Sequence, residues 1–340
     1  MRLRLAPELR GVAFALVLLV AVSAVAASGT LRGSALLSML PFAAMLTIAA
    51  IGQTLVVQHG GLDLSVAGVI SLAAAIVTKG SQSLAGGLAV ALLLVLVAAL
   101  AIGLCNGLLV ARLGITPLIA TLGTNAVLTG VVLTVTDGVP SAAPQALAEI
   151  ALERTVGVPN TVIAALIVIA VVAALLRWSV LGRRHVAVGV SVPAARHAGV
   201  RVSTYRVAPY VAAALCFALA GVLIAGFQQS PGVAVGNDYL IPTVAVVVLA
   251  GTPLTGGRAS VLATVLAALF LTQLDQLVLA LGAPTATQYL IQGAVIAVGV
   301  AAREMSFLQN LGRRWWAALR RAGRQRPSTP QSPTTTSSRQ

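Results

Sequence analysis

The 340 residues carry 58% hydrophobic and only 9% charged side chains, whereas an average soluble domain has roughly 25% charged residues. Apolar runs of about 17 to 25 residues recur along the chain, and this length crosses a hydrocarbon layer as a helix. A water-soluble core and an outer-membrane barrel are both excluded, because stretches such as 88–102 contain no polar residue. The sequence therefore predicts an all-α polytopic membrane protein.

The apolar runs predict about ten transmembrane helices. They cover residues 12–28, 35–58, 64–78, 85–111, 117–136, 159–177, 207–227, 240–252, 259–281 and 286–302. The first run ends in Ala24-Val25-Ala26, which is similar to a signal-peptidase site, so cleavage that leaves nine spans is an alternative. The run at 240–252 is short and contains Pro242. We keep it because its removal would place the basic tail opposite the other arginines.

The net charge of +14 is spread unevenly between the runs. If the N-terminus is cytoplasmic, only Arg32, Lys79 and Arg154 of the 22 Lys and Arg residues lie outside. This asymmetry follows the positive-inside rule, and both termini are therefore predicted to be cytoplasmic. We expect residues 1–302 to form the membrane domain. Residues 303–326 read as a basic amphipathic cytoplasmic segment and residues 327–340 as a disordered tail.

Two connections are long enough to contact a partner, an outside loop over 137–159 and an inside loop over 178–206. In the inside loop a short helix is predicted over 192–198, with Ser191 as its N-cap and Gly199 as its C-terminal stop. Such a helix suggests a docking element. The alternative is that the arginines of this loop only fix the orientation and contact anionic lipid head groups.

A glycine pair and an acid join the second and third runs in Gly60-Gly61-Leu62-Asp63-Leu64-Ser65. Glycines permit a tight turn, and Asp63 or Ser65 can accept hydrogen bonds from the free amides of the next helix. A carboxylate near a membrane is also a candidate functional group. For Asp63, capping and function both stay open.

The segment 106–124 forms an inside turn in which Thr116 caps and Pro117 opens the next helix. Gly103 and Gly107 lie four residues apart, a spacing that lets another helix approach closely. Further along, Asp275 lies within an apolar run close to Gln273 and Gln276. It marks either a polar pathway or a buried hydrogen bond between helices.

No motif supports catalysis, because the chain has no GxxxxGK[ST] phosphate loop and no HExxH. Its three histidines all fall in predicted inside loops. The sequence therefore predicts no ATP hydrolysis, no metal and no cofactor in this chain.

At these motifs the sequence resembles the ribose-type permeases of ATP-binding-cassette (ABC) importers, the membrane subunits for ribose, other pentoses and hexoses, and autoinducer-2. The resemblance covers 60–65, 106–124, and 245–252 followed by Gly256-Gly257. One departure is Pro253, where the family usually has a small polar residue. The resemblance implies motif or pathway positions at Gly60, Gly61, Asp63, Ser65, Asn106, Gly107, Thr121, Gly123, Gly251, Thr252, Gly256, Gly257 and Asp275.

The inside loop is also similar to the family region that contacts the ATPase. The family often has Asn where this chain has Ser191 or Val192, and a serine can replace that cap. The resemblance implies ATPase-coupling roles for Gly182, Arg183, Gly189, Ser191, Ala194, Ala195, Arg196 and Gly199.

The resemblance implies a multi-pass permease of the bacterial cytoplasmic membrane that imports a monosaccharide or a related small polar solute. Its implied partners are a second permease chain, identical or different, two cytoplasmic ATPase domains and an extracytoplasmic solute-binding protein, without nucleic acid. The alternatives are a branched-chain amino-acid ABC permease and an ion-coupled secondary transporter, which would need more deep ionisable groups than Asp275. An intramembrane aspartyl protease is disfavoured, because Gly236-Asn237-Asp238 does not match GxGD.

Overall fold

The computed structural model describes residues 7–83, 85–284, 286–294 and 296–298. The chain divides into two compact units, Met1–Ile296 and Ala297–Gln340, and the first unit holds the helical bundle. The predicted basic segment 303–326 and the tail 327–340 lie outside the described residues.

Helices make up most of the first unit. The one hairpin among its described residues pairs two strands of two residues each, β1 and β2. The helices and strands, in chain order, are α1 (Pro7–Ala26), η1 (Ser28–Leu31), α2 (Gly33–Val57), α3 (Val66–Ala75), η2 (Ile76–Gly80), α4 (Ser81–Ser83), α5 (Gly87–Ala111), α6 (Pro117–Thr136), α7 (Gln145–Leu152), β1 (Arg154–Thr155), β2 (Val158–Pro159), α8 (Asn160–Trp178), α9 (Val180–Val190), α10 (Val192–His197), α11 (Val202–Gln228), α12 (Asn237–Leu249) and α13 (Val261–Ala280).

Each predicted apolar run coincides with a helix, and residues 299–302 of the last run lie outside the described residues. Of those described, seven are long and apolar enough to cross a membrane: α1, α2, α5, α6, α8, α11 and α13. The other three are shorter, namely α3, α12 and the helix Ala286–Val298. The all-α polytopic prediction is therefore confirmed, while the count of ten spans stays a prediction.

The helices differ in how much apolar surface they bury. Helices α2 and α3 lie in the core, where every residue from Ala43 to Val57 and every residue of α3 is buried. By contrast α1, α5, α6 and α8 expose rows of Leu, Ile and Val side chains. A face of this kind is stable only against lipid or another apolar surface, which agrees with a membrane-embedded bundle.

Small residues let the core helices approach α11 closely. A Cβ on Gly103 of α5 would lie 2.6 Å from the Val211 Cα, and one on Gly107 would lie 3.0 Å from the Val207 Cα. On α2, a Cβ on Gly52 would lie 3.0 Å from the Ala213 Cα. The predicted packing role of Gly103 and Gly107 is thus confirmed, and α11 becomes the common neighbour of α2, α3 and α5.

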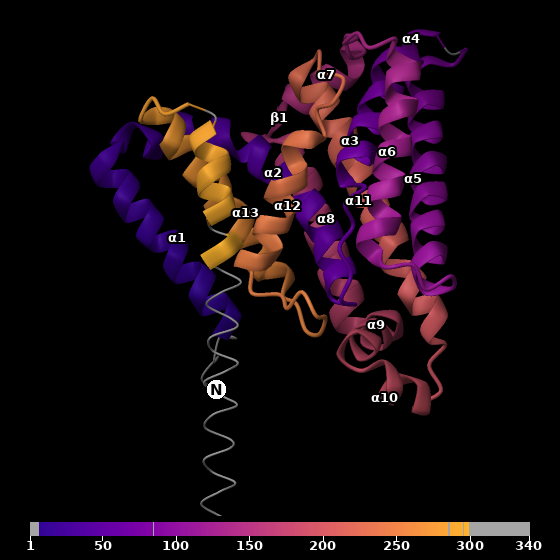
Figure 1. Cartoon of the computed structure of the whole chain (residues 1–340). Coiled ribbons are helices and arrows are strands. Elements are labelled where there is room, and N and C mark those ends of the chain that lie inside the picture. Colours follow the sequence, from indigo (N-terminus) through magenta and orange to yellow (C-terminus); the bar gives the residue numbers. More distant parts are fainter. Residues whose placement is uncertain (1–6, 84, 285, 295, 299–340) are drawn as a thin grey trace, which may run out of the picture. The chain divides into compact units, whose positions relative to one another are not determined.

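Figure 1 places α9 and α10 at one end of the helices and α7 at the other. Hydrogen bonds join the connections at the α7 end. Gln82 Nε2 donates to the Ala142 carbonyl at 2.9 Å, and the Ala143 N–H donates to the Gln229 carbonyl at 2.6 Å. The two ends carry different candidate sites.

Candidate functional site

The inside loop folds into two consecutive helices, α9 and α10. Ser179 caps α9 by accepting a hydrogen bond from the Gly182 N–H at 2.9 Å, and Ser191 caps α10 by accepting from the Ala194 N–H at 3.3 Å. Gly199 follows α10 with φ +74°, a conformation that favours glycine. The predicted short helix is therefore confirmed, whereas α9 was not predicted.

The predicted coupling residues divide between an inner and an outer face. Gly182 packs against the α8 backbone at Leu175 and Leu176, and Ala195 is buried against Val188, Val202 and Tyr205. The outer face carries the exposed Arg183, Ala194 and Arg196. One face holds the loop to its own chain, and the other is free to meet a partner.

Three glycine-containing segments meet where α9 ends, and we call this contact the glycine junction. It consists of 58–60 after α2, Gly189 in the last turn of α9, and 256–257 before α13. A Cβ on Gly189 would lie 2.5 Å from the Gln58 carbonyl oxygen, and one on Gly256 would lie 3.0 Å from the Gly60 nitrogen. Gly60 and Gly256 have φ of +73° and +92°, so both the conformation and the close approach require glycine.

Hydrogen bonds hold the same junction together. The Gly257 N–H donates to the Gln58 carbonyl at 2.9 Å. His59 Nε2 donates to the His185 carbonyl at 3.1 Å, and His185 Nε2 donates to Gln58 Oε1 at 2.9 Å. The two imidazole rings stack with centroids 4.3 Å apart. The inside loop is thus bonded directly to the turn after α2.

Both histidines lie in turns and helices outside the seven spans, and both are neutral at pH 7. Burial lowers the pKa of His59 to about 4, and the positive charge of Arg206 acts in the same direction. Burial together with the neighbouring His59 lowers the pKa of His185 to about 3. Neutral rings can stack without repulsion. Sequence reasoning missed this pair, although it had placed all the histidines in inside loops.

A second group of motif residues forms a buried hydrogen-bond chain beside the junction. Asp63 Oδ1 accepts from the Ser65 hydroxyl at 2.5 Å and from the Ser65 N–H at 3.0 Å. Asn106 Nδ2 donates to Ser65 Oγ at 2.9 Å, and Thr124 Oγ1 donates to Asn106 Oδ1 at 2.5 Å. This chain ties the turn before α3 to α5 and α6.

The predicted cap of α3, in which the side chain of Asp63 or Ser65 accepts from the free amides of the helix, is wrong. Asp63 and Ser65 bond to each other and not to the first turn of α3. Helix α6 meets one amide of that turn, because Asn125 Oδ1 accepts from the Gly68 N–H at 2.8 Å. Thr121 Oγ1, also of α6, accepts from the Leu64 N–H just before α3 at 3.0 Å. At the start of α6, Thr116 occupies the N-cap position without a side-chain bond.

The remaining motif residues lie at the edges of these two clusters. Gly61 packs against the Tyr210 side chain, and Gly123 faces open space within this chain. Gly251 has φ +81°, and Thr252 is buried beside it. Pro253 does not prevent the turn before Gly256, since its carbonyl accepts from the Gly256 N–H at 3.1 Å.

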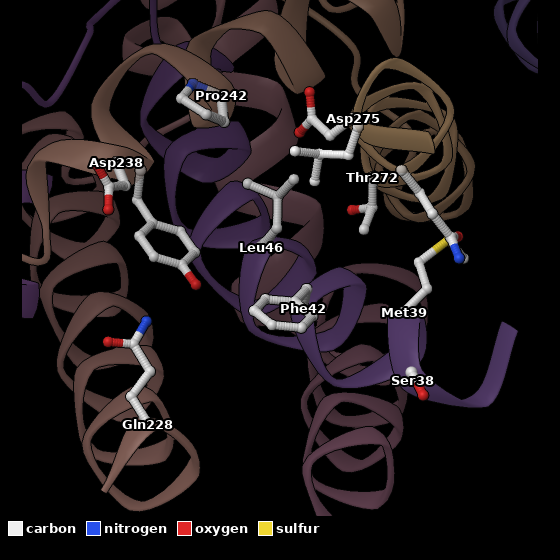
Figure 2. Close-up of a pocket in the computed structure, with 12 residues that line it drawn as sticks. Ser38, Met39, Phe42, Leu46, Gln228, Asp238, Pro242, Thr272 and Asp275 are labelled. Atoms are coloured by element: carbon white, nitrogen blue, oxygen red, sulfur yellow. The ribbon is translucent and has the colours of Figure 1, made fainter. Parts of the chain in front are cut away.

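Asp275 lies apart from the other motif residues, in a cavity of about 410 Å³ between α2, the end of α11, α12 and α13. Figure 2 shows its carboxylate on the rim, with Asp238 across the space and Phe42 below. Asp275 Oδ1 also accepts from Gln292 Nε2 at 3.2 Å. Both roles left open for Asp275, a polar pathway and a bond between helices, therefore fit its geometry. Sequence reasoning missed Asp238, Gln228 and Phe42, which are separated from Asp275 by long stretches of chain.

Comparisons with known proteins show which family this chain is similar to. Residues 35–300 match the family model described as "Branched-chain amino acid transport system / permease component". The chain is 32% identical over 260 residues to a probable ABC transporter permease of Sinorhizobium fredii, which covers 76% of this chain and 77% of that protein. It is 30% identical over 270 residues to the ribose import permease of Bacillus subtilis, covering 78% and 83%.

A third relative is the galactofuranose transporter permease of Escherichia coli, 32% identical over 284 residues that cover 82% of each chain. No solved structure matches the chain. These relatives are transport subunits and not enzymes, and the apolar helices make this chain a multi-pass protein of the bacterial inner membrane. The chain belongs to the ribose-type ABC permease family and is the permease subunit of an ABC importer.

Proposed function

We propose that this permease carries a monosaccharide or a related small polar solute into the cell, driven by a separate ATPase that docks on α9 and α10. The glycine junction is the observation that carries the proposal. Because Gly189 of α9 touches the Gln58 carbonyl and the backbone at Gly256, a push on α9 is passed to α2 and to the turn before α13 without flexible side chains between them.

The outer face of the two helices has the chemistry of a docking site. Arg183 and Arg184 of α9 and Arg196 of α10 are exposed, and so is the small side chain of Ala194. Within the described residues the only ion pair is Lys79 with Asp137, far from this face. An acidic cleft on the ATPase would complement these charges, and Ala194 leaves room for close approach.

Ten spans with both termini in the cytoplasm agree with how the connections meet. The junction joins three connections that this topology places inside, after α2, within 178–206 and before α13. Connections that it places outside also meet one another, through Gln82 with Ala142 and Ala143 with Gln229. Among the described residues, no backbone hydrogen bond mixes these two sets of connections.

The complete importer in this proposal contains a second copy or a paralogue of this permease, two ATPase domains and an extracytoplasmic solute-binding protein. The outside loop 137–159 is its dock for the binding protein. That loop carries α7 and the β1–β2 hairpin, and Glu149 and Glu153 border a hollow on it. Reversal of both charges should weaken docking of the binding protein.

The choice of a sugar-type solute rests on the names of the relatives, which include ribose, galactofuranose and autoinducer-2 permeases. The family model's description names branched-chain amino acids instead, so these are the second candidate. An assay must therefore include both classes.

The test is uptake of labelled pentoses, hexoses and branched-chain amino acids into vesicles that hold this permease with its ATPase and binding protein. In a variant of this permease, a glycine-serine linker replaces residues 191–200. In the control variant, the same linker replaces residues 331–340. We expect ATP-dependent uptake of a pentose or hexose that is lost in the first variant and kept in the control, with assembly of the complex intact. Uptake that ignores ATP and follows a proton or sodium gradient would overturn the proposal.

A further inference from the structure

We infer that the cavity between α2, α12 and α13 is a solute-binding site within the membrane, and that it selects neutral polyhydroxylated solutes over anions. The inference rests on the proposed function, because it names the solute chemistry of the same pathway. Residues from four elements meet at the cavity, and those the argument uses are Phe42, Gln228, Asp238, Tyr239, Asp275 and Gln276.

The position of the cavity fits a site that is loaded from outside. Phe42 lies near the start of α2, whereas Gln58 at the other end belongs to the glycine junction. At the helical rise of 1.5 Å per residue these two positions are about 24 Å apart. Gln228 lies at the end of α11, beside the Gln229 carbonyl that bonds the outside loop. In the proposed topology the cavity therefore opens toward the binding protein.

The lining combines two kinds of surface that a sugar ring needs. Figure 2 shows Asp238, Asp275 and Gln228 as oxygen acceptors at separate points of the rim, with the aromatic ring of Phe42. Tyr239 also lines the cavity and adds a second aromatic ring. Sugar hydroxyls donate to carboxylates and amides, while the C–H face of the ring packs on aromatic groups. A volume of about 410 Å³ lies within the range of small-molecule sites.

Charge decides which polar solute the cavity accepts. Two of the lining residues are acids, and none of the described residues that line it is Lys, Arg or His. The positive end of α12 is already met by Asp238 in its first turn. A solute with a carboxylate or phosphate would find repulsion here and no cationic partner. A branched-chain amino acid could pair its ammonium with either acid, but its carboxylate would find no cationic partner here, whereas a neutral sugar leaves no charge unpaired.

The acceptors are held in place before a solute arrives. Asp275 accepts from Gln292 at 3.2 Å, and Asp238 accepts from the Tyr289 hydroxyl at 3.5 Å. Both donors come from the helix Ala286–Val298. Gln276 donates through Nε2 to the Ala35 carbonyl at 3.3 Å, and its Oε1 is buried without a partner among the described residues. A buried acceptor of this kind marks a place where a ligand hydroxyl can bind.

The experiment measures ATP-driven uptake in vesicles at saturating, solute-loaded binding protein, so that only the permease changes. The probe is the neutral pentose or hexose that the wild-type complex imports best. The variants are Asp275→Asn, Asp238→Asn, Phe42→Ala and Gln228→Lys. The matched control is Ser83→Lys, which adds the same positive charge on an exposed residue at the same end of the helices, outside the cavity, where the hydroxyl bonds only the preceding turn.

We expect each cavity variant to lower the maximal uptake rate about tenfold. The two Asp→Asn changes weaken a charged hydrogen bond, Phe42→Ala removes aromatic packing surface, and Gln228→Lys replaces an acceptor with a positive charge. In a separate titration the binding-protein concentration at half-maximal rate should stay constant, and Ser83→Lys should match the wild type. Co-purification with the ATPase verifies folding, and Asp275→Glu should restore part of the rate if the carboxylate itself contacts the solute. A wild-type rate in Asp275→Asn, Asp238→Asn and Gln228→Lys alike overturns the inference while the proposed function stands. A wild-type complex that imports no neutral monosaccharide overturns the proposed function and the inference together.

Discussion

The glycine junction and the cavity lie at opposite ends of α2 and differ in what fills the space between their elements. At the junction, backbone atoms of Gln58, Gly60 and Gly189 lie so close to Gly256 that a Cβ there would stand 3.0 to 3.3 Å from each. At the cavity, side chains surround about 410 Å³ of open space. One region is a contact between backbones, and the other is a site between side chains.

This difference shows how α2 can serve both the coupling contact at one end and the solute site at the other. A backbone contact has few soft degrees of freedom, so it transmits displacement, whereas a site between side chains recognises a ligand and tolerates changes of shape. Helix α2 is buried from Ala43 to Val57 and so joins the regions as a supported rod. Pro41 interrupts its hydrogen bonding just before Phe42, which makes the cavity end the place where the rod bends most easily.

The largest expected effect comes from a methyl group at the junction. In Gly256→Ala the new Cβ would contact three backbone atoms, and alanine is strained at φ +92°. Gly114→Ala is the matched control, since Gly114 has φ +71° but no neighbour within 4 Å. Both variants carry a strain of about 1–3 kcal/mol. We expect ATP-driven uptake to fall more than tenfold in Gly256→Ala only.

Uptake and ATP hydrolysis should be measured together in these two variants. Hydrolysis that continues in Gly256→Ala while uptake is lost would show that the junction couples the two processes. Equal losses in both variants would mean that backbone strain alone matters, and the contrast between junction and cavity would then lose its basis.

The next effect concerns the buried chain beside the junction. Asn106→Ala removes the partner of both Ser65 and Thr124, which should cost about 1–3 kcal/mol because buried polar groups are left unsatisfied. Thr129→Ala, on the exposed side of α6 where the hydroxyl bonds only its own helix, should change little. The thermal unfolding midpoint in detergent should be lower for Asn106→Ala than for Thr129→Ala. Similar midpoints for the two variants would contradict a stabilising role for Asn106.

The sequence predicted the helices well because a membrane span is a continuous run of apolar residues. Even the short cap pattern at Ser191 and Gly199 was readable, since capping depends on residues a few positions apart. The residues 60–65 were correctly marked as a turn. Their bonds were not predictable, because Thr121 and Asn125 come from a helix about 57 residues further along.

The two sites were predicted only in part for the same reason. Asp275 stood out as an acid in an apolar run, but its companions Asp238 and Phe42 join it only when α2, α12 and α13 pack. Gly60, Gly189 and Gly256 were each noticed in their own motif. That they touch one another depends on long-range packing, which local pattern does not contain.

A smaller effect tests whether the histidine stack holds α9 at the junction. Burial lowers the pKa of His59 to about 4 and that of His185 to about 3 when α9 is docked on the junction. If α9 leaves the junction, both histidines regain ordinary pKa values near 6.5, so the docked state of α9 binds fewer protons than the undocked state. The docked state is therefore favoured fully above about pH 6.5 and loses stability as the pH falls toward 4.

Hydrogen exchange of the α9 amides, corrected for the intrinsic rate at each pH, measures this docking. We expect protection of α9 to fall between pH 7 and pH 5 in the wild type and in the control His197→Gln, whose histidine is exposed. The double variant His59→Gln with His185→Gln should lose this pH dependence. A wild-type profile that is flat across this range would contradict the role of the stack.

The smallest effect lies on the outer face, where the cap of α10 is replaced. Ser191→Ala removes the acceptor of the Ala194 N–H, and loss of an N-cap costs about 1 kcal/mol. The ATPase concentration at half-maximal uptake should therefore rise about fivefold, because α10 must be reordered on docking. Ser191→Asn should leave it unchanged, since asparagine caps equally well. If both variants dock as the wild type does, α10 serves only to pack Ala195 against Val188, Val202 and Tyr205, and the ATPase must contact α9 alone.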